Sequence, residues 1–441
     1  MTDLQPAGSP RSNGIWAVAQ QVSTLALTGL FSIVLVRFVS VAEFGLYSYA
    51  VSFASLGVAI MVSGLQGLAI REFRTRPEAS SAILASLFFI RELMAVAVYL
   101  IFVVFTLATS EQSIVAPTLV ACLAIFARVM DAPELWFQAK LLTKIPALIR
   151  IVTAVIFFGL RLIVLIWYPS VFALVALFVA EQLVNGVWIV LSYRRASREK
   201  AFTRPRRLET STLARRALPL ALSGVSNQIN LRSDVLIIQA LAGSTSVGLY
   251  AAAARISEIL YAFPTAYMNA TFPSLLDVRK KFGSNSSEYR RELQRGFDTA
   301  FWFGVFVVAG TLICADWAIT LLFGPDYAES SSVLKVHVLA CPFVFMAAIL
   351  SKWIVAEDKL WVSLFRHTLG AAFSIVLNLL LIPEFGIVGS AWATVVSYAA
   401  ASYLFCFLTP STIPVAWMMT KALIAPLRLV AHFFKQRGST P

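Results

Sequence analysis

The chain has 441 residues, of which 59% are hydrophobic and only 13% are charged. Soluble proteins carry about 25% charged residues, so this composition excludes a soluble globular protein and indicates many membrane-spanning segments. The net charge of +13 then indicates cytoplasmic loops rich in Lys and Arg, not a nucleic-acid partner. The four cysteines are far apart in apolar stretches, which predicts neither a disulfide nor a zinc site. The short polar segment at the N-terminus lacks the features of a signal peptide.

Twelve apolar segments are long enough to cross a bilayer, which takes about 20 residues of helix. Only helices satisfy their own backbone groups in lipid over such lengths, so we expect an all-α integral membrane protein. Turn-forming sequences separate the segments, for example AGSTS at 242–246 and IPEFG at 382–386. The predicted spans are about 15–37, 45–69, 81–108, 114–136, 146–168, 171–193, 217–241, 247–273, 298–323, 331–354, 361–382 and 386–409.

The distribution of Lys and Arg fixes the expected orientation. With the N-terminus in the cytoplasm, the basic clusters at 71–76, 194–216 and 279–295 all face the cytoplasm, and the outer loops carry no Lys or Arg. Twelve spans then place both termini inside. The last segment, 414–437, has basic residues on one helical face and apolar residues opposite, which predicts a helix lying in the membrane interface. A thirteenth span is the alternative.

The basic segment 194–216 divides the chain into two six-helix lobes, 1–193 and 217–409, followed by a cytoplasmic amphipathic helix and tail at 410–441. The sequences GLYSYAVSFA at 45–54 and GLYAAAARIS at 248–257 both open the second helix of their half. This indicates a parallel repeat related by a pseudo-two-fold axis along the membrane normal, with the substrate site between the halves.

Polar side chains inside the predicted spans are costly in lipid and therefore mark candidate functional sites. Ser223, Asn227, Asn230 and Asp234 form one stripe on the seventh span, with Arg232 beside it. Because basic residues outnumber acids in the spans, we expect an anionic cargo such as a phosphate, which guanidinium groups bind bidentately. The predicted cationic site comprises Arg37, Arg91, Arg128, Arg232, Arg255, Asn227 and Asn230.

Acids in the same spans have two possible roles. A desolvated carboxyl can take up a proton or Na⁺ and couple it to transport. Alternatively, acids neutralise arginines and hold helices together, as the i,i+3 pairs Arg128–Asp131 and Arg255–Glu258 suggest. Arg150, near the inner end of its helix, is expected to extend to the membrane surface. The candidate ion-coupling residues are Asp234, Glu258, Glu181, Glu92 and Asp131.

Several segments, in order, resemble bacterial polysaccharide flippases of the multidrug/oligosaccharidyl-lipid/polysaccharide exporter superfamily. They include RFVSVAEFGLYSYAVSFASLG at 37–57, the stretch at 219–260, LLFGPDYAESSSVLKV at 321–336 and LIPEFGIVGSAWAT at 381–394. The resemblance reaches to about residue 408. It implies two lobes in a V around a cationic cavity and alternating access for an undecaprenyl-pyrophosphate-linked oligosaccharide. Arg37 and the Arg232–Asp234 pair match family positions best.

We therefore expect a flippase of the bacterial cytoplasmic membrane, acting as a monomer without enzymatic activity, cofactor or metal. The expected partners are the lipid-linked glycan, membrane lipids, and a polysaccharide polymerase or glycosyltransferases. The alternatives are a multidrug/cation antiporter, whose cavity should be rich in acids, and a membrane glycan polymerase, which should present a large outer loop. The sequence predicts neither the sugar composition of the cargo nor the coupling ion.

Overall fold

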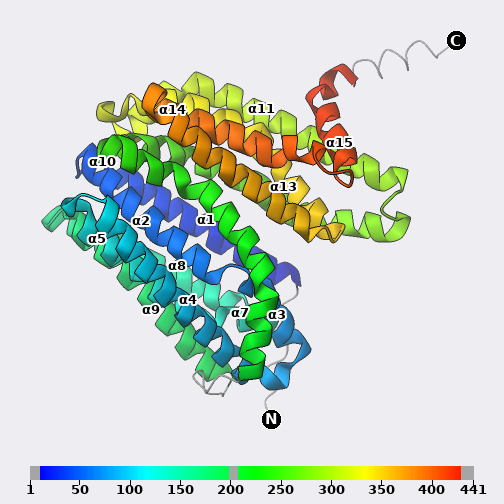
Figure 1. The fold of residues 1–441 in the computed structure, drawn as a ribbon, viewed down its shortest axis with the longest axis horizontal. Coiled ribbons are helices and arrows are strands. Elements are labelled where there is room, and N and C mark those ends of the chain that lie inside the picture. Colours follow the sequence, from blue (N-terminus) through cyan, green and yellow to red (C-terminus); the bar gives the residue numbers. More distant parts are fainter. Residues whose placement is uncertain (1–9, 198–206, 429–441) are drawn as a thin grey trace. The chain divides into compact units, whose positions relative to one another are not determined.

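The computed structural model describes residues 10–197 and 207–428, and within them the secondary structure is entirely helical. The chain forms two compact units (Figure 1). The first, here called the N-terminal unit, comprises Met1–Ala252 and Leu322–Tyr327; the second, the C-terminal unit, comprises Ala253–Leu321 and Ala328–Pro441. Residues 217–252 thus belong to the N-terminal unit.

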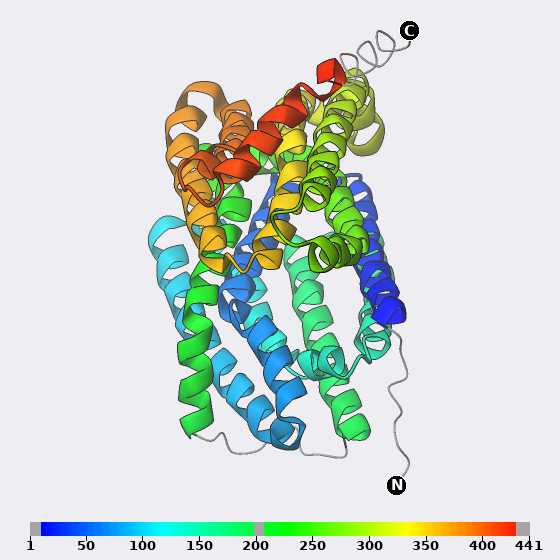
Figure 2. The same ribbon diagram turned by 90° about the vertical axis from the view of Figure 1, so that its right-hand side faces the viewer.

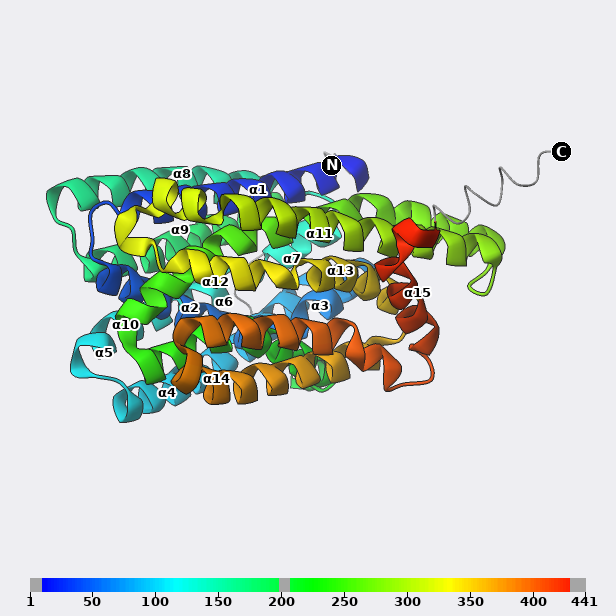
Figure 3. The ribbon, with the colours of Figure 1, turned by 90° about the horizontal axis from the view of Figure 1, so that it is seen from above.

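The N-terminal unit is a bundle in which helices distant in the sequence lie side by side: α2 packs against α5, and Figure 3 shows α1 next to α8 along its length. A capping box begins α2, because the Ser40 side chain accepts from the backbone of Glu43 and the Glu43 carboxylate accepts from the backbone of Ser40. The helices of this unit are α1 (Pro10–Leu35), α2 (Val41–Val62), α3 (Leu65–Thr75), α4 (Ser80–Thr109), α5 (Gln112–Cys122), α6 (Ala124–Val129), α7 (Glu134–Ala139), α8 (Lys144–Trp167), α9 (Val171–Ser197) and the first part of α10 (Arg207–Phe282).

Two predicted spans are broken in this unit. The segment 45–69 is divided between α2 and α3 by a left-handed Gly64, whose φ is 77°. The segment 114–136 is divided among α5, α6 and α7, with non-helical turns around residues 130–133. Pro133 contributes to the second break, because proline lacks the N–H that would continue the helix. Polar side chains at or next to the two breaks, Gln66 and Asp131, line a cavity of the unit.

The C-terminal unit packs around Phe297, Met346, Leu350 and Trp353. Figure 2 shows its helices from a second direction. Besides the end of α10, its helices are α11 (Ser287–Phe323), whose last two residues are assigned to the N-terminal unit, α12 (Ser330–His337), α13 (Cys341–Ala356), α14 (Leu360–Ser402) and α15 (Ile413–Leu423).

The helix α15 packs into this core. Met419 of the predicted apolar face is buried, whereas Leu423 and Leu427 are exposed. Trp302 of α11 donates to the carbonyl of Ala422 at 2.9 Å, and Arg428 donates to Asp298 of α11 at 2.6 Å. Residues 429–437 of the predicted interfacial helix lie outside the described residues.

Ten helical stretches in the described part of the chain are long and apolar enough to cross a membrane. Two of them, Ala221–Tyr261 and Trp361–Phe407, are far longer than the roughly 20 residues that one crossing needs. Each contains a glycine with a non-helical backbone: Gly243 has φ 77° and ψ 178°, and Gly386 has φ 58° and ψ −143°. Both glycines fall in the turn-forming sequences expected between spans.

Hydrogen bonds show that the chain reverses at both glycines. Tyr250 donates to Asp234 at 2.6 Å across Gly243, and Ser390 donates to Asn378 at 2.6 Å across Gly386. In a straight helix, residues 16 or 12 positions apart would be separated by about 24 or 18 Å. The two arms of α14 accordingly lie side by side in Figures 1 and 3. The protein is therefore an all-helical, multi-pass membrane protein.

Candidate functional site

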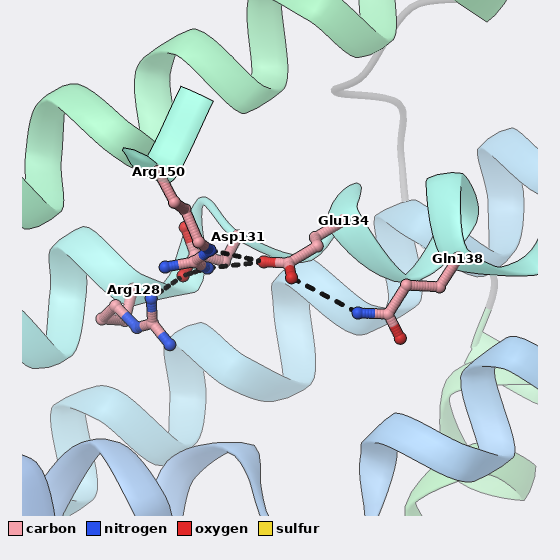
Figure 4. Close-up of polar contacts among 5 residues, drawn as sticks. All are labelled: Arg128, Asp131, Glu134, Gln138 and Arg150. Carbon is pink, nitrogen blue, oxygen red and sulfur yellow. Dashed lines mark hydrogen bonds and ion pairs between the residues drawn. The ribbon is translucent and has the colours of Figure 1, made fainter. Parts of the chain in front are cut away.

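A network of charged side chains lies inside the N-terminal unit (Figure 4). Asp131, in the turn between α6 and α7, accepts from Arg128 of α6 at 2.6 Å and from Arg150 of α8 at 2.9 Å. Arg150 also donates to Glu134 of α7, at 2.5 Å from Nη2 and 3.2 Å from Nε. Gln138, one helical turn along α7, donates to the other oxygen of Glu134 at 3.3 Å. The network therefore joins the two short helices α6 and α7 to the long helix α8 through charge-assisted bonds.

The sequence predicted only part of this network. The i,i+3 spacing anticipated the pair Arg128–Asp131, which the structure forms. Arg150 was expected to extend to the membrane surface, but its side chain is only 12% exposed and bonds two carboxylates. Glu134 and Gln138 were missed altogether. Their i,i+4 spacing at the end of an apolar segment was the available signal.

Arg91 of α4 lies beside this network and is only 3% exposed. Its Nε and Nη1 atoms are buried and have no hydrogen-bond partner among the described residues. Leaving buried donors unsatisfied costs about 1–3 kcal/mol each. Arg91 is thus a buried guanidinium that would be stabilised by an added hydrogen-bond acceptor.

Two neighbouring cavities hollow the unit around these residues. The smaller, of about 190 Å³, is lined by Arg91, Asp131 and Glu134 among others. The larger, of about 430 Å³, extends toward Glu181 of α9. Gln20, Val62, Arg128 and Arg150 line both cavities, so we describe them together as the polar pocket.

Glu181 lines the polar pocket but is already paired. Arg161 of α8 donates to it at 2.5 Å, and the Arg161 guanidinium also lies over the ring of Phe31, 5.2 Å from the centroid. Glu92, the residue after Arg91, points elsewhere: it is exposed and lines an apolar groove of about 730 Å³ with Phe88 and Phe89. Arg91 therefore lines the polar pocket, whereas Glu92 lines the apolar groove.

Other candidates of the N-terminal unit lie outside the polar pocket. Arg37 follows the end of α1 and donates to the carbonyl of Leu322 at 3.4 Å. On α10, Asn227 and Arg232 are partly buried and Asp234 is buried, held by Tyr250. Asn230 is also buried, and its Oδ1 atom has no partner among the described residues.

The remaining candidates belong to the C-terminal unit. Arg255 and Glu258 form the predicted i,i+3 pair, with an N–O distance of 3.1 Å. Arg366 of α14, which was not among the candidate site residues, is 4% exposed and donates to Ser351 at 2.8 Å. No group of three or more His, Cys, Asp or Glu residues suited to a metal occurs in the described ranges 10–197 and 207–428.

Comparison with known proteins gives two overlapping family matches. Residues 11–278 match the family model described as polysaccharide biosynthesis protein, and residues 206–435 match the model described as lipid II flippase MurJ. Each match covers more than half of the chain.

Among curated proteins, the chain is 32% identical over 178 residues to the probable flippase AglR of Haloferax volcanii, covering 39% of this chain and 36% of AglR. It is 23% identical over 185 residues to the capsular polysaccharide biosynthesis protein CapF of Staphylococcus aureus, covering 42% of this chain and 46% of CapF. The matches therefore span less than half the length of these relatives.

Solved structures share the fold at low identity. Lipid II flippase MurJ in an inward closed conformation matches with a TM-score of 0.74 and 17% identity, covering 93% of this chain and 91% of that one. A MOP superfamily transporter from Pyrococcus furiosus gives 0.60 and 13%, covering 95% and 97%. An inward-facing multidrug transporter of the MATE family gives 0.56 and 15%, covering 93% of each chain. From the family matches, the chain belongs to the polysaccharide biosynthesis flippase family, a family of transporters and not of enzymes.

Proposed function

We propose that this protein translocates a polyprenyl-pyrophosphate-linked glycan across the membrane in which it resides. The observation that carries the proposal is the polar pocket, a set of buried charged side chains inside otherwise apolar helices. Ionisable groups at such positions are expensive and mark the path of a polar substrate. Family membership supports the same class of cargo.

The proposed transport cycle is alternating access. The ten apolar stretches, with reversals at Gly243 and Gly386, would make twelve crossings in two lobes around a cavity, with both termini in the cytoplasm. Arg232 and Arg255 would bind the phosphates, and Arg91 would contact another part of the cargo. Coupling to a proton or Na⁺, through Asp234 or another of the five acids, forms part of the proposal.

A multidrug/cation antiporter is the runner-up, because the MATE transporters share this fold. The polar pocket favours the glycan flippase. Three guanidiniums line it, and one of them, Arg91, has no carboxylate bonded to it. Arg91 would repel a cationic drug, whereas a cargo rich in hydroxyl groups could accept hydrogen bonds from it.

The test is a deletion strain of the source organism, from which polyprenyl-linked glycans are extracted and analysed. We expect complete glycan units to accumulate on the cytoplasmic leaflet, with loss of surface glycan. The wild-type gene should restore export, and so should the control variant Arg295→Ala, which alters a 68% exposed side chain. Arg255→Ala should be inserted and folded but fail to restore export.

Unchanged pools of lipid-linked glycan and unchanged surface glycan, in a strain without a redundant exporter, would refute the flippase and favour small-molecule antiport. Full export by Arg255→Ala would show that Arg255 does not bind the phosphates, but it would not contradict the proposal that the protein is a flippase.

A further inference from the structure

The charges of the polar pocket are nearly balanced. Arg128 and Arg150 are bonded to Asp131 and Glu134, and Glu181 is bonded to Arg161. Among the described residues that line the pocket, only Arg91 adds a positive charge that no bonded carboxylate offsets. A pyrophosphate diester carries two negative charges, so a single surplus guanidinium matches it poorly. The pocket is therefore not built primarily for phosphate.

Carboxamides make up much of the remaining polar lining. They come from four different helices, α1, α3, α7 and α9. Each carboxamide offers both hydrogen-bond donors and an acceptor. The five lining carboxamides are those of Gln20, Gln66, Gln138, Gln182 and Asn185.

The residues that line the pocket include both hydrogen-bond donors and hydrogen-bond acceptors that have no partner in the described part of the chain. Arg91 has two buried donors without a partner, while Asp131 and Asn185 each have a buried Oδ1 acceptor without a partner among the described residues. A phosphate oxygen could accept from Arg91 but would be repelled by the Asp131 carboxylate. A hydroxyl group both donates and accepts, so vicinal hydroxyls could satisfy all three residues.

Size and shape fit the same ligand. The larger cavity, about 430 Å³, falls within the range of about 300–1,000 Å³ that is usual for small-molecule sites. Phe178 of α9 lines it and offers an aromatic face. Sugar rings present apolar C–H faces as well as hydroxyl edges, so they can pack on an aromatic ring while bonding to amides and carboxylates.

We propose that the polar pocket binds one or two sugar rings of the glycan through their hydroxyl groups, and that the pyrophosphate is held elsewhere. This inference rests on the proposed function for the identity of the cargo. It does not depend on transport, because the pocket lies within one unit and can be tested by binding alone.

The experiment uses the purified full-length chain in lipid nanodiscs, prepared without glycoside detergents. Saturation-transfer difference NMR is recorded with three probes, methyl glucoside, methyl N-acetylglucosaminide and methyl glucuronide, and pyrophosphate is followed by its phosphorus signal. The pocket variant is Gln182→Leu combined with Asn185→Leu. The matched control is Gln112→Leu, an exposed glutamine at the start of α5 that does not line the pocket.

We expect saturation transfer to the ring protons of at least one glycoside. Binding should weaken by roughly two- to tenfold for each hydrogen bond removed in the pocket variant, and it should be unchanged in the control. If the pocket variant does not fold, a diazirine-bearing glycoside supplies the second measurement. Its crosslinks should map to peptides of α1 to α4 or α6 to α9, the helices that line the pocket.

Three results would overturn the inference: no transfer to any glycoside, equal transfer to a folded pocket variant, or crosslinks confined to other helices. Pyrophosphate binding that the pocket variant abolishes, without glycoside binding, would identify an anion site instead. Glycoside binding that persists while the deletion strain exports its glycans normally would leave the pocket standing and refute the proposed transport role.

Discussion

Gly45 and Gly248 meet at a reciprocal backbone contact between α2 and α10. A methyl group added to Gly45 would overlap the carbonyl oxygen of Ser244 and lie 2.8 Å from the nitrogen of Gly248. A methyl group added to Gly248 would overlap the carbonyl oxygen of Val41. Each glycine therefore meets the carbonyl one helical turn before the other glycine. The two glycines open the repeated sequences GLYSYAVSFA and GLYAAAARIS, and a two-fold relation between the copies would produce this symmetry.

This contact predicts that alanine is poorly tolerated at either glycine. Gly45→Ala or Gly248→Ala should destabilise the protein by about 1–3 kcal/mol, because the obstructing atoms are backbone and cannot move aside. Thermal unfolding in nanodiscs measures the effect. The control is Gly159→Ala in α8, where an added methyl meets no atom within 4 Å, and its stability should equal or exceed that of the wild type. Equal midpoints for Gly45→Ala and the control would contradict the contact.

The two acids of the charged network should differ in importance. Asp131→Asn removes a charge that two guanidiniums share, and we expect a loss of about 3–5 kcal/mol. Glu134→Gln should cost less, since Arg150 keeps its bond to Asp131. Chemical or thermal unfolding of the two variants side by side gives the comparison. A larger loss of stability for Glu134→Gln than for Asp131→Asn would contradict the expectation that Asp131 is the more important acid of the network.

The pair Arg161–Glu181 should behave as a buried ion pair. Glu181→Gln leaves Arg161 buried without its partner and should destabilise the protein by about 3–5 kcal/mol. The double variant Arg161→Met/Glu181→Leu should recover most of that loss, because apolar side chains replace the pair. A double variant as unstable as the single one would argue against this account.

The same double variant tests Glu181 as an ion-coupling residue. It has no carboxylate at that position, so it cannot carry a proton or Na⁺ there. Ion-dependent export that persists in a complemented deletion strain would remove Glu181 from the coupling candidates.

Arg91→Met should separate stability from transport. The variant removes two unsatisfied buried donors, so the unfolding midpoint should stay level or rise. Glycan export should nevertheless fall at least about tenfold, which corresponds to about 1.4 kcal/mol of lost interaction with the cargo. Arg295→Met is the exposed control. Export at the wild-type level by Arg91→Met would assign Arg91 no part in handling the cargo.

Local spacing predicted some contacts of the candidate site and failed for others. Arg128–Asp131 and Arg255–Glu258 are one helical turn apart, so the sequence alone placed their side chains together. Arg161 lies 20 residues from Glu181, and Arg150 lies 19 from Asp131. Such pairs depend on which helix faces pack against each other, and hydropathy carries no information on that. Because such distant pairs were not foreseen, the sequence suggested more unpaired basic residues in the spans than the structure has in the polar pocket.

Hydropathy predicted where the apolar spans begin and end, but not whether each span is one unbroken helix. It located the turns that contain Gly243 and Gly386, because polar and turn-forming residues gather there. It treated 114–136 as one helix, although the segment forms three. An apolar composition is common to a straight helix and a broken one, and Pro133 was the local signal of the break.

The reversals at Gly243 and Gly386 bear on how the chain enters the membrane during synthesis. In each hairpin, a polar side chain on one arm is bonded by a hydroxyl on the other: Asp234 by Tyr250, and Asn378 by Ser390. A single arm released into lipid would expose an unsatisfied polar group, which is costly. Two arms leaving the translocon together carry these bonds with them. Each hairpin is thus suited to insert as a pair before the rest of the bundle has assembled.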